Sequence, residues 1–296
     1  MMRIGTYNCF DIVFERFLLD GGAMFGIIPK PLWERQISAD EKNRIPMVTR
    51  CLLISGNQKN ILVDTGIGDK LSDKLQDRYS VHPIVSQDEI KAALPAGFDI
   101  SAADITDVVL THLHFDHAGG ATRYGRDKIP EPVFPNAVYH VQRAQWEFAH
   151  SPSLRDEGSY IAENYDCLKA SGRLNLIDGP ADNFFAGIDI LVSHGHTIGQ
   201  QHVLVSGLDS GSDKEGQASL FFASDLVPTA AHVPLVWHMA YDNQPLDLVS
   251  EKAEILGRAA AQDWVVCFPH DPVYAAARLK RDADGRIVIR ERLERL

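Results

Sequence analysis

The apolar and β-branched residues of the chain fall in short runs separated by glycine, proline and polar residues, a pattern typical of β-strands. Runs of this kind lie at 3–10, 47–54, 61–63, 105–110, 137–141, 188–192, 202–205, 220–223 and 264–268. The pattern therefore predicts a protein with many strands.

Helical patterns lie between these strands. The stretch 86–94 begins with Ser86 and Glu89, whose spacing is that of a capping box, and 246–261 is the longest helical stretch. The polar, glycine-containing stretch 208–217 predicts a hairpin loop rather than a domain linker. Since strands and helices alternate without a break in composition, we expect one α/β domain over residues 1–296. Two sheets with helices outside would form a four-layer αββα sandwich.

Composition and charge narrow the class of partner. The chain has 296 residues, 45% of them hydrophobic, which is enough for a large buried core. Its 40 acidic and 29 basic side chains give a net charge of -11, so the average surface repels phosphate backbones and nucleic acid is not an expected partner. No apolar stretch approaches the roughly 20 residues of a membrane span, and residues 1–18 lack the pattern of a secretory signal. We therefore expect a soluble, cytoplasmic protein without a membrane partner.

The four cysteines fit that compartment. Cys9, Cys51, Cys167 and Cys267 are far apart and form no C-x-x-C pair. A chain of this size does not need disulfides to hold its core, so buried free thiols are expected in a reducing cytoplasm.

One loop concentrates the candidate chemistry. The apolar run 108–110 leads directly into a loop with four potential metal ligands in six residues, His112, His114, Asp116 and His117. Alternate side chains at His112 and His114 can point the same way, while Asp116 and His117 turn toward a second centre. A merely polar loop is the alternative, but such a cluster is costly to hold without a metal. Imidazole and carboxylate suit zinc, with iron, manganese or cobalt as alternatives.

The pattern H-x-H-x-D-H after an apolar strand resembles the signature of the metallo-β-lactamase superfamily. That resemblance implies a later histidine in a G-H-T context, an aspartate ending a strand and a histidine ending another; the chain has His196, Asp225 and His270 in these contexts. The resemblance further implies two metal ions. The first would be held by His112, His114 and His196, the second by Asp116, His117 and His270, and Asp225 would bridge them. Asp64, in L-V-D-T-G, would orient a ligand from behind.

A dinuclear zinc centre would favour hydrolysis. Even one zinc ion lowers the pKa of bound water from about 15.7 to about 7, so the expected nucleophile is a hydroxide. Asp116 is the candidate for accepting its proton and passing it to the leaving group, the alternative being a purely structural role as a ligand.

The substrate is less constrained than the metal site. The segments 21–33 and 228–241 resemble the branch that contains acyl-homoserine lactonases and methyl parathion hydrolase. Their glycines, aromatics and histidines are interpreted as loops around a substrate pocket, with ordinary core packing as the alternative. The expected pocket residues are Met24, Phe25, Trp33, His232, Trp237 and His238.

Three positions depart from the family patterns. The best-known lactonases of this type place a tyrosine shortly after the bridging aspartate to bind the substrate oxygen, but this chain has none there; His232, His238, Tyr241 or the metal itself could substitute. His194 stands where the superfamily motif often has proline, and Gln200 stands where it often has histidine. His194 is expected to be a solvated surface histidine, with a pocket residue as the alternative.

A lactone or other carboxylic ester is therefore the preferred small-molecule substrate. An organophosphate triester or a glyoxalase-type thioester is the alternative. Nuclease and diiron oxidoreductase activities are disfavoured. Exposed aromatic loops also allow a homodimer.

Overall fold

The computed structural model describes residues 1–206 and 218–296. The hairpin predicted at 208–217 lies outside the described residues. Two compact units account for the chain: the first unit comprises Met1–Met2, Tyr7–Phe17 and Val48–Gly179, and the second unit comprises Arg3–Thr6, Leu18–Met47 and Pro180–Leu296. The expectation of one domain over 1–296 stays a prediction.

An eight-stranded sheet with the order β1-β2-β3-β4-β6-β9-β10, and β5 paired to β2, lies mainly in the first unit. Its strands are β1 (Met2–Ile4), β2 (Tyr7–Asp20), β3 (Arg44–Gly56), β4 (Lys59–Val63), β5 (His82–Pro83), β6 (Asp107–Val109), β9 (Val138–Gln142) and β10 (Leu174–Ile177). β4, β6, β9 and β10 pair in parallel, so their carboxyl ends meet at one edge. That edge carries the residue after β4 and the loop after β6.

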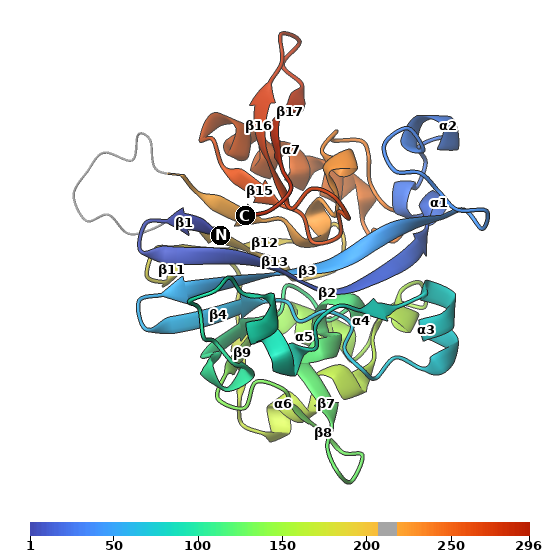
Figure 1. The fold of residues 1–296 in the computed structure, drawn as a ribbon. Helices are drawn as coiled ribbons and strands as arrows, with labels where there is room; N and C mark the ends of the chain where they lie inside the picture. Colours follow the sequence, from blue (N-terminus) through green and yellow to red (C-terminus); the bar gives the residue numbers. More distant parts are fainter. Residues whose placement is uncertain (207–217) are drawn as a thin grey trace. The chain divides into compact units, whose positions relative to one another are not determined.

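Helices and a small hairpin complete the first unit. The helices are α3 (Asp73–Tyr79), α4 (Phe115–Ala118), α5 (Arg143–Ala149) and α6 (Asp166–Ala170), and the hairpin strands are β7 (Thr122–Tyr124) and β8 (Pro130–Pro132). α5 packs against β9 and β10 (Figure 1). Leu62, Val108 and Tyr139, one from each of three neighbouring strands, are fully buried in the apolar core of this unit.

A seven-stranded sheet with the order β11 to β17 forms the second unit. Its strands are β11 (Ala181–Phe185), β12 (Ile188–Ser193), β13 (Gln200–Val205), β14 (Leu220–Phe222), β15 (Val265–Cys267), β16 (Ala276–Arg281) and β17 (Ile287–Leu293). β14 and β15 pair in parallel, whereas the other neighbours are antiparallel. Two short helices, α1 (Gly21–Phe25) and α2 (Lys30–Trp33), also belong here.

The longest helix, α7 (Pro245–Ala261), packs on β16 and β17 (Figure 1). Its buried positions Leu248, Ile255, Leu256 and Ala259 recur at helical spacing and join Phe221 and other residues of the second core. This helix agrees with the stretch 246–261 expected from the pattern.

The α/β class with two sheets and helices is confirmed, and every predicted strand overlaps an observed one. Seven strands in the described part of the chain were not predicted, because they are short or mix buried with partly or fully exposed residues and give no clear apolar run; they are β5, β7, β8, β10, β11, β16 and β17. The capping box at Ser86 is wrong: η1 (Gln87–Ala93) is a 3₁₀-helix interrupted at Glu89, and the Ser86 side chain does not cap it. A capping box forms instead between Ser101 and Asp104.

The four cysteines form no disulfide among themselves. Cys9, Cys51 and Cys267 are buried thiols, as expected, and Cys167 is a half-buried thiol. No helix in the described ranges 1–206 and 218–296 has the length and apolar character needed to cross a bilayer.

Candidate metal centre

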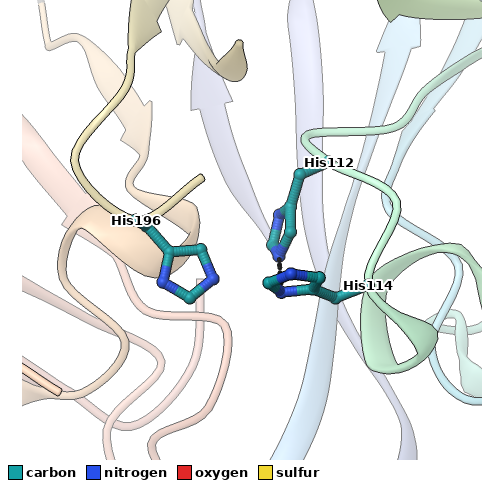
Figure 2. A group of neighbouring side chains, drawn as sticks. All are labelled: His112, His114 and His196. Carbon is teal, nitrogen blue, oxygen red and sulfur yellow. Dashed lines mark hydrogen bonds between the residues drawn. The ribbon is translucent and has the colours of Figure 1, made fainter. Parts of the chain in front are cut away.

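The loop after β6 presents the first group of candidate ligands. His112, His114 and His117 are buried, and the Nε2 atom of His112 lies 3.0 Å from the Nδ1 atom of His114 (Figure 2). Asp116 is half-buried, with an oxygen 4.0 Å from His117 Nε2. The two histidines at alternate positions thus point toward one another, as the spacing predicts, and the nitrogen pair can serve one cation.

Asp64 orients this loop from the end of the parallel strand β4. Its Oδ1 accepts the backbone N–H of Thr111 at 2.7 Å, and its Oδ2 accepts the Thr111 hydroxyl at 2.8 Å and the Nδ1–H of His117 at 2.8 Å. The Thr111 hydroxyl also lies 3.1 Å from His112 Nδ1. Since the Nδ1 atoms of His112 and His117 contact these partners, their Nε2 atoms are left as the ligand atoms.

Asp225 lies between two histidines of the second unit. One carboxylate oxygen is 3.3 Å from His196 Nε2 and the other is 3.0 Å from His270 Nε2. Asp225 follows β14 and His270 follows β15, so the parallel pairing brings both strand ends to the same edge. Ser224, directly before Asp225, has a φ of +46°, a costly backbone for a residue other than glycine. A carboxylate with each oxygen beside a different imidazole nitrogen has the arrangement of a bridging ligand.

The sequence reasoning missed Asp242, which holds His196 from the other side. Its fully buried carboxylate accepts the Nδ1–H of His196 at 2.8 Å and the backbone N–H of Met239 at 2.7 Å. Burial would raise the pKa of Asp242, but the hydrogen bond from His196 and the nearby His238 ring bring it below its ordinary value. His196 therefore has a carboxylate beside each of its ring nitrogens. A neutral imidazole has one N–H and can donate to only one of the two carboxylates, so a cation at Nε2 would satisfy the second.

The seven candidate ligands fall into groups that could hold a metal ion. Each unit contributes one group: His112, His114, Asp116 and His117 in the first unit, and His196, Asp225 and His270 in the second. Zinc bonds of about 2.0–2.2 Å at tetrahedral angles place ligand atoms roughly 3.3 Å apart. The measured separations of 3.0 and 3.3 Å fit this spacing. The donor set of imidazole and carboxylate suits divalent cations.

The aromatic residues expected to line a pocket form a packed cluster in the second unit. The Phe25 ring stacks on Trp33 at 5.2 Å and on His232 at 4.6 Å, and meets Trp237 edge-on at 5.8 Å. Met24, Phe25, Trp33 and His232 are buried, as core packing requires. Their contact with a substrate stays a prediction.

His232 cannot replace the missing tyrosine. Its Nδ1 lies 2.7 Å from the Thr229 hydroxyl and its Nε2 lies 2.8 Å from the carbonyl oxygen of Met24. Burial lowers the pKa of His232 to about 4, so the ring is neutral at pH 7. Both nitrogens are thus engaged inside the protein.

The two remaining histidines differ in exposure. His238 is half-buried, and the Asp242 carboxylate, 3.7 Å from its Nδ1, raises its pKa. His194 is exposed, as expected, and its Nδ1 accepts the backbone N–H of Gly199.

The chain is similar to known proteins in sequence and in fold. The family model of the metallo-beta-lactamase superfamily matches residues 44–270. A solved structure of a probable metal-dependent hydrolase from Staphylococcus aureus has a TM-score of 0.83 and 30% sequence identity, covering 98% of this chain and 99% of that chain.

Two lactonases are also similar to parts or all of the chain. An N-acyl homoserine lactonase of Rhizobium johnstonii is 33% identical over 123 residues, so the match spans 40% of each chain. A dizinc quorum-quenching lactonase, solved with a product, has a TM-score of 0.72 at 20% identity and covers 97% of this chain and 95% of that chain. At that identity the likeness concerns the fold alone.

Proposed function

The chain belongs to the metallo-beta-lactamase superfamily and is a metal-dependent hydrolase, and from this premise we propose that it binds two zinc ions and hydrolyses a lactone or another carboxylic ester. The observation that carries the proposal is Asp225, whose two oxygens face His196 and His270 separately. Iron, manganese or cobalt would suit the same donors.

The proposed ligand sets are those that the resemblance to the superfamily implies. His112, His114 and His196 would hold one ion, Asp116, His117 and His270 the other, and Asp225 would contact both. When bound, such ions supply a hydroxide nucleophile near neutral pH and polarise the substrate carbonyl. Asp64 and Asp242 keep His117 and His196 in the orientation that directs Nε2 toward the centre.

Asp116 is our candidate for moving the proton. Its half-buried carboxylate stands near His117 in the loop and would accept a proton from the attacking water and pass it to the leaving oxygen. Asp116→Asn tests this role: we expect full metal occupancy with a rate roughly a hundredfold lower, within the usual range for acid–base catalysis. Full occupancy with unchanged turnover would leave Asp116 as a ligand without a proton-transfer role.

An ester or lactone is preferred because several curated relatives are N-acyl homoserine lactonases, whereas others are described only as probable metallo-hydrolases. The chain spans about two fifths of the length of the Rhizobium johnstonii lactonase that it matches, so the substrate is carried over only as a proposal. Phosphotriesters and thioesters are the alternatives. We further propose that the protein acts in the cytoplasm, without a nucleic acid partner; a homodimer stays a prediction.

The direct test is an activity panel on the purified, zinc-loaded protein. Acyl-homoserine lactones, simple aryl esters, a thioester and a phosphotriester would be compared by kcat/KM. We expect lactones or esters to be hydrolysed fastest. Lactone and ester turnover no faster than that of the phosphotriester would reject the preferred substrate class, whereas no turnover of any of them would remove the proposed activity.

A further inference from the structure

A buried carboxylate on β2, remote from the candidate ligands in sequence, is the starting point. The Glu15 side chain is 3% exposed and accepts hydrogen bonds from the Thr49 hydroxyl, the backbone N–H groups of Ile67 and Gly68, both at 3.2 Å, and the Gln87 side-chain amide at 2.9 Å. Burying a charge is costly unless it is hydrogen-bonded, so four donors around one carboxylate mark a built network.

This network holds the loop that follows β4. The Gln87 amide donates to the carbonyl of Thr65 at 2.9 Å as well as to Glu15. Gly66 has a φ of +76°, and a Cβ there would collide with the Glu15 carboxylate, so the loop backbone lies directly against it. Glu15 and Gln87 thus contact the loop 64–68. They bind the N–H groups of Ile67 and Gly68 and the carbonyl of Thr65.

The same loop contacts His117 at both its main chain and its ring. The backbone N–H of Thr65 and its hydroxyl donate to the carbonyl of His117 at 2.8 and 2.9 Å. Next to Thr65, Asp64 binds the His117 ring at 2.8 Å from a backbone with a φ of +60°. A non-glycine residue in that region keeps its conformation only where the surroundings impose it.

We propose that Glu15 and Gln87 are positioning residues for the metal centre: they fix the loop 64–68, and through Asp64 and Thr65 they fix the orientation of His117. The inference rests on the proposed metal function, and it assigns a role to two buried side chains that are not candidate ligands. Outer partners of metal histidines typically change metal affinity by 10- to 100-fold when mutated.

Glu15→Gln tests the proposal at nearly constant volume. The substitution removes the charge and turns one acceptor into a donor that faces donors. We expect the second of two zinc ions to bind roughly tenfold more weakly, measured by competition with a chromophoric chelator on the apo-protein, together with an altered visible spectrum of the cobalt-substituted form. Gln87→Met, which removes the bonds to Glu15 and Thr65, should give the same change and serves if Glu15→Gln does not fold.

Asp107→Asn is the matched control. Asp107 is a buried carboxylate of the same sheet, bonded to Lys59 and His140 rather than to the loop 64–68. This variant should lose stability and keep the zinc affinity of the wild type. If it weakens zinc binding as much as Glu15→Gln does, the effect is general destabilisation and the proposal fails.

A double-mutant cycle with Asp64→Asn identifies the route. If Glu15 acts through Asp64, the loss of affinity in the double variant is smaller than the sum of the single losses on a free-energy scale. Losses of affinity that add up in the double variant would overturn this inference and leave the proposed function standing. Unchanged zinc affinity in both Glu15→Gln and Gln87→Met would do the same. A wild-type protein that binds no divalent metal would overturn the proposed function and this inference with it.

Discussion

At the scale of single residues, the candidate centre is organised by carboxylates that contact histidine rings. Asp64 binds His117, Asp242 binds His196, and Asp225 contacts both His196 and His270. Each contact fixes which ring nitrogen faces the proposed ions. Asp64 and Asp225 were predicted from their motifs, whereas Asp242 stands in no motif and lies 46 residues from its partner.

Asp225→Asn should be the most damaging single change. An amide has one neutral oxygen in place of the two carboxylate oxygens that face His196 and His270. We therefore expect fewer than two zinc ions per chain and a fall in kcat/KM of about 10²–10³-fold, the size seen when one electrostatic group is removed from an active site. Metal content by elemental analysis, with kinetics on the same sample, checks this. Asp247→Asn, at an exposed carboxylate of α7, is the control and should retain both.

A pH-dependent prediction concerns Asp107. Burial alone would raise its pKa, but hydrogen bonds from His140, Lys59 and Thr106 outweigh burial and lower the pKa to about 2. A pKa lowered on folding stabilises the native state above the ordinary value near 3.8, and that stability is lost as the pH falls through the folded value. Asp107→Asn should therefore cost about 2 kcal/mol at pH 7.

Urea unfolding of both proteins at several pH values checks the sign. The difference in unfolding free energy between wild type and Asp107→Asn should shrink between about pH 4 and pH 2. A difference that stays constant from pH 7 to pH 2 would contradict the assigned ionisation.

At the scale of elements, α7 supports two loops of the second unit. Glu251 accepts the backbone N–H groups of His194 and Gly195 at 2.7 and 3.0 Å, just before the ligand His196. A Cβ on Gly195 would collide with the backbone of Leu248, so the loop lies directly on the helix. On the next position of α7, the buried Lys252 donates to the carbonyls of His232 and Trp237 at 2.6 and 2.7 Å.

Lys252→Met tests the second of these supports. The change removes a donor from buried carbonyls of the segment 232–237, and unsatisfied buried groups cost about 1–3 kcal/mol each, so we expect destabilisation of roughly 3 kcal/mol. Thermal unfolding measures it, and the fluorescence of Trp237 should report loosening of the segment. Ser250→Ala, at an exposed position of the same helix, should change neither the thermal stability nor the fluorescence. A Lys252→Met protein with wild-type stability and native fluorescence would show that Lys252 does not support the segment 232–237.

At the scale of the whole molecule, the proposed ions would stabilise the folded chain. Their ligands are spread from His112 to His270, so the unfolded chain cannot gather them. A ligand at 100 times its Kd stabilises by about 2.7 kcal/mol. Chelation should therefore lower Tm by several degrees and zinc should restore it, with a smaller shift in Asp225→Asn; an unchanged Tm after verified metal removal would contradict the coupling.

The sequence by itself determined the α/β class, most strands, the long helix and the candidate ligands, because each leaves a local trace. A strand or helix shows as a short apolar period, and the ligand cluster stands in one loop directly after a buried strand. The strands β16 and β17, which mix buried and exposed residues, and the 3₁₀-helix interrupted at Glu89 left no such trace.

Only the tertiary structure decided which side chains support the ligands. Glu15 and Gln87 are 72 residues apart, and Asp242 meets His196 across 46. The tertiary structure also gives both ring nitrogens of His232 hydrogen-bond partners inside the protein, whereas the sequence left this residue as a candidate for binding substrate. These contacts form only when strands and loops that are distant in the sequence pack together. The free energy of a hydrogen bond depends on whether packing buries it, and the type of the residue alone does not determine that.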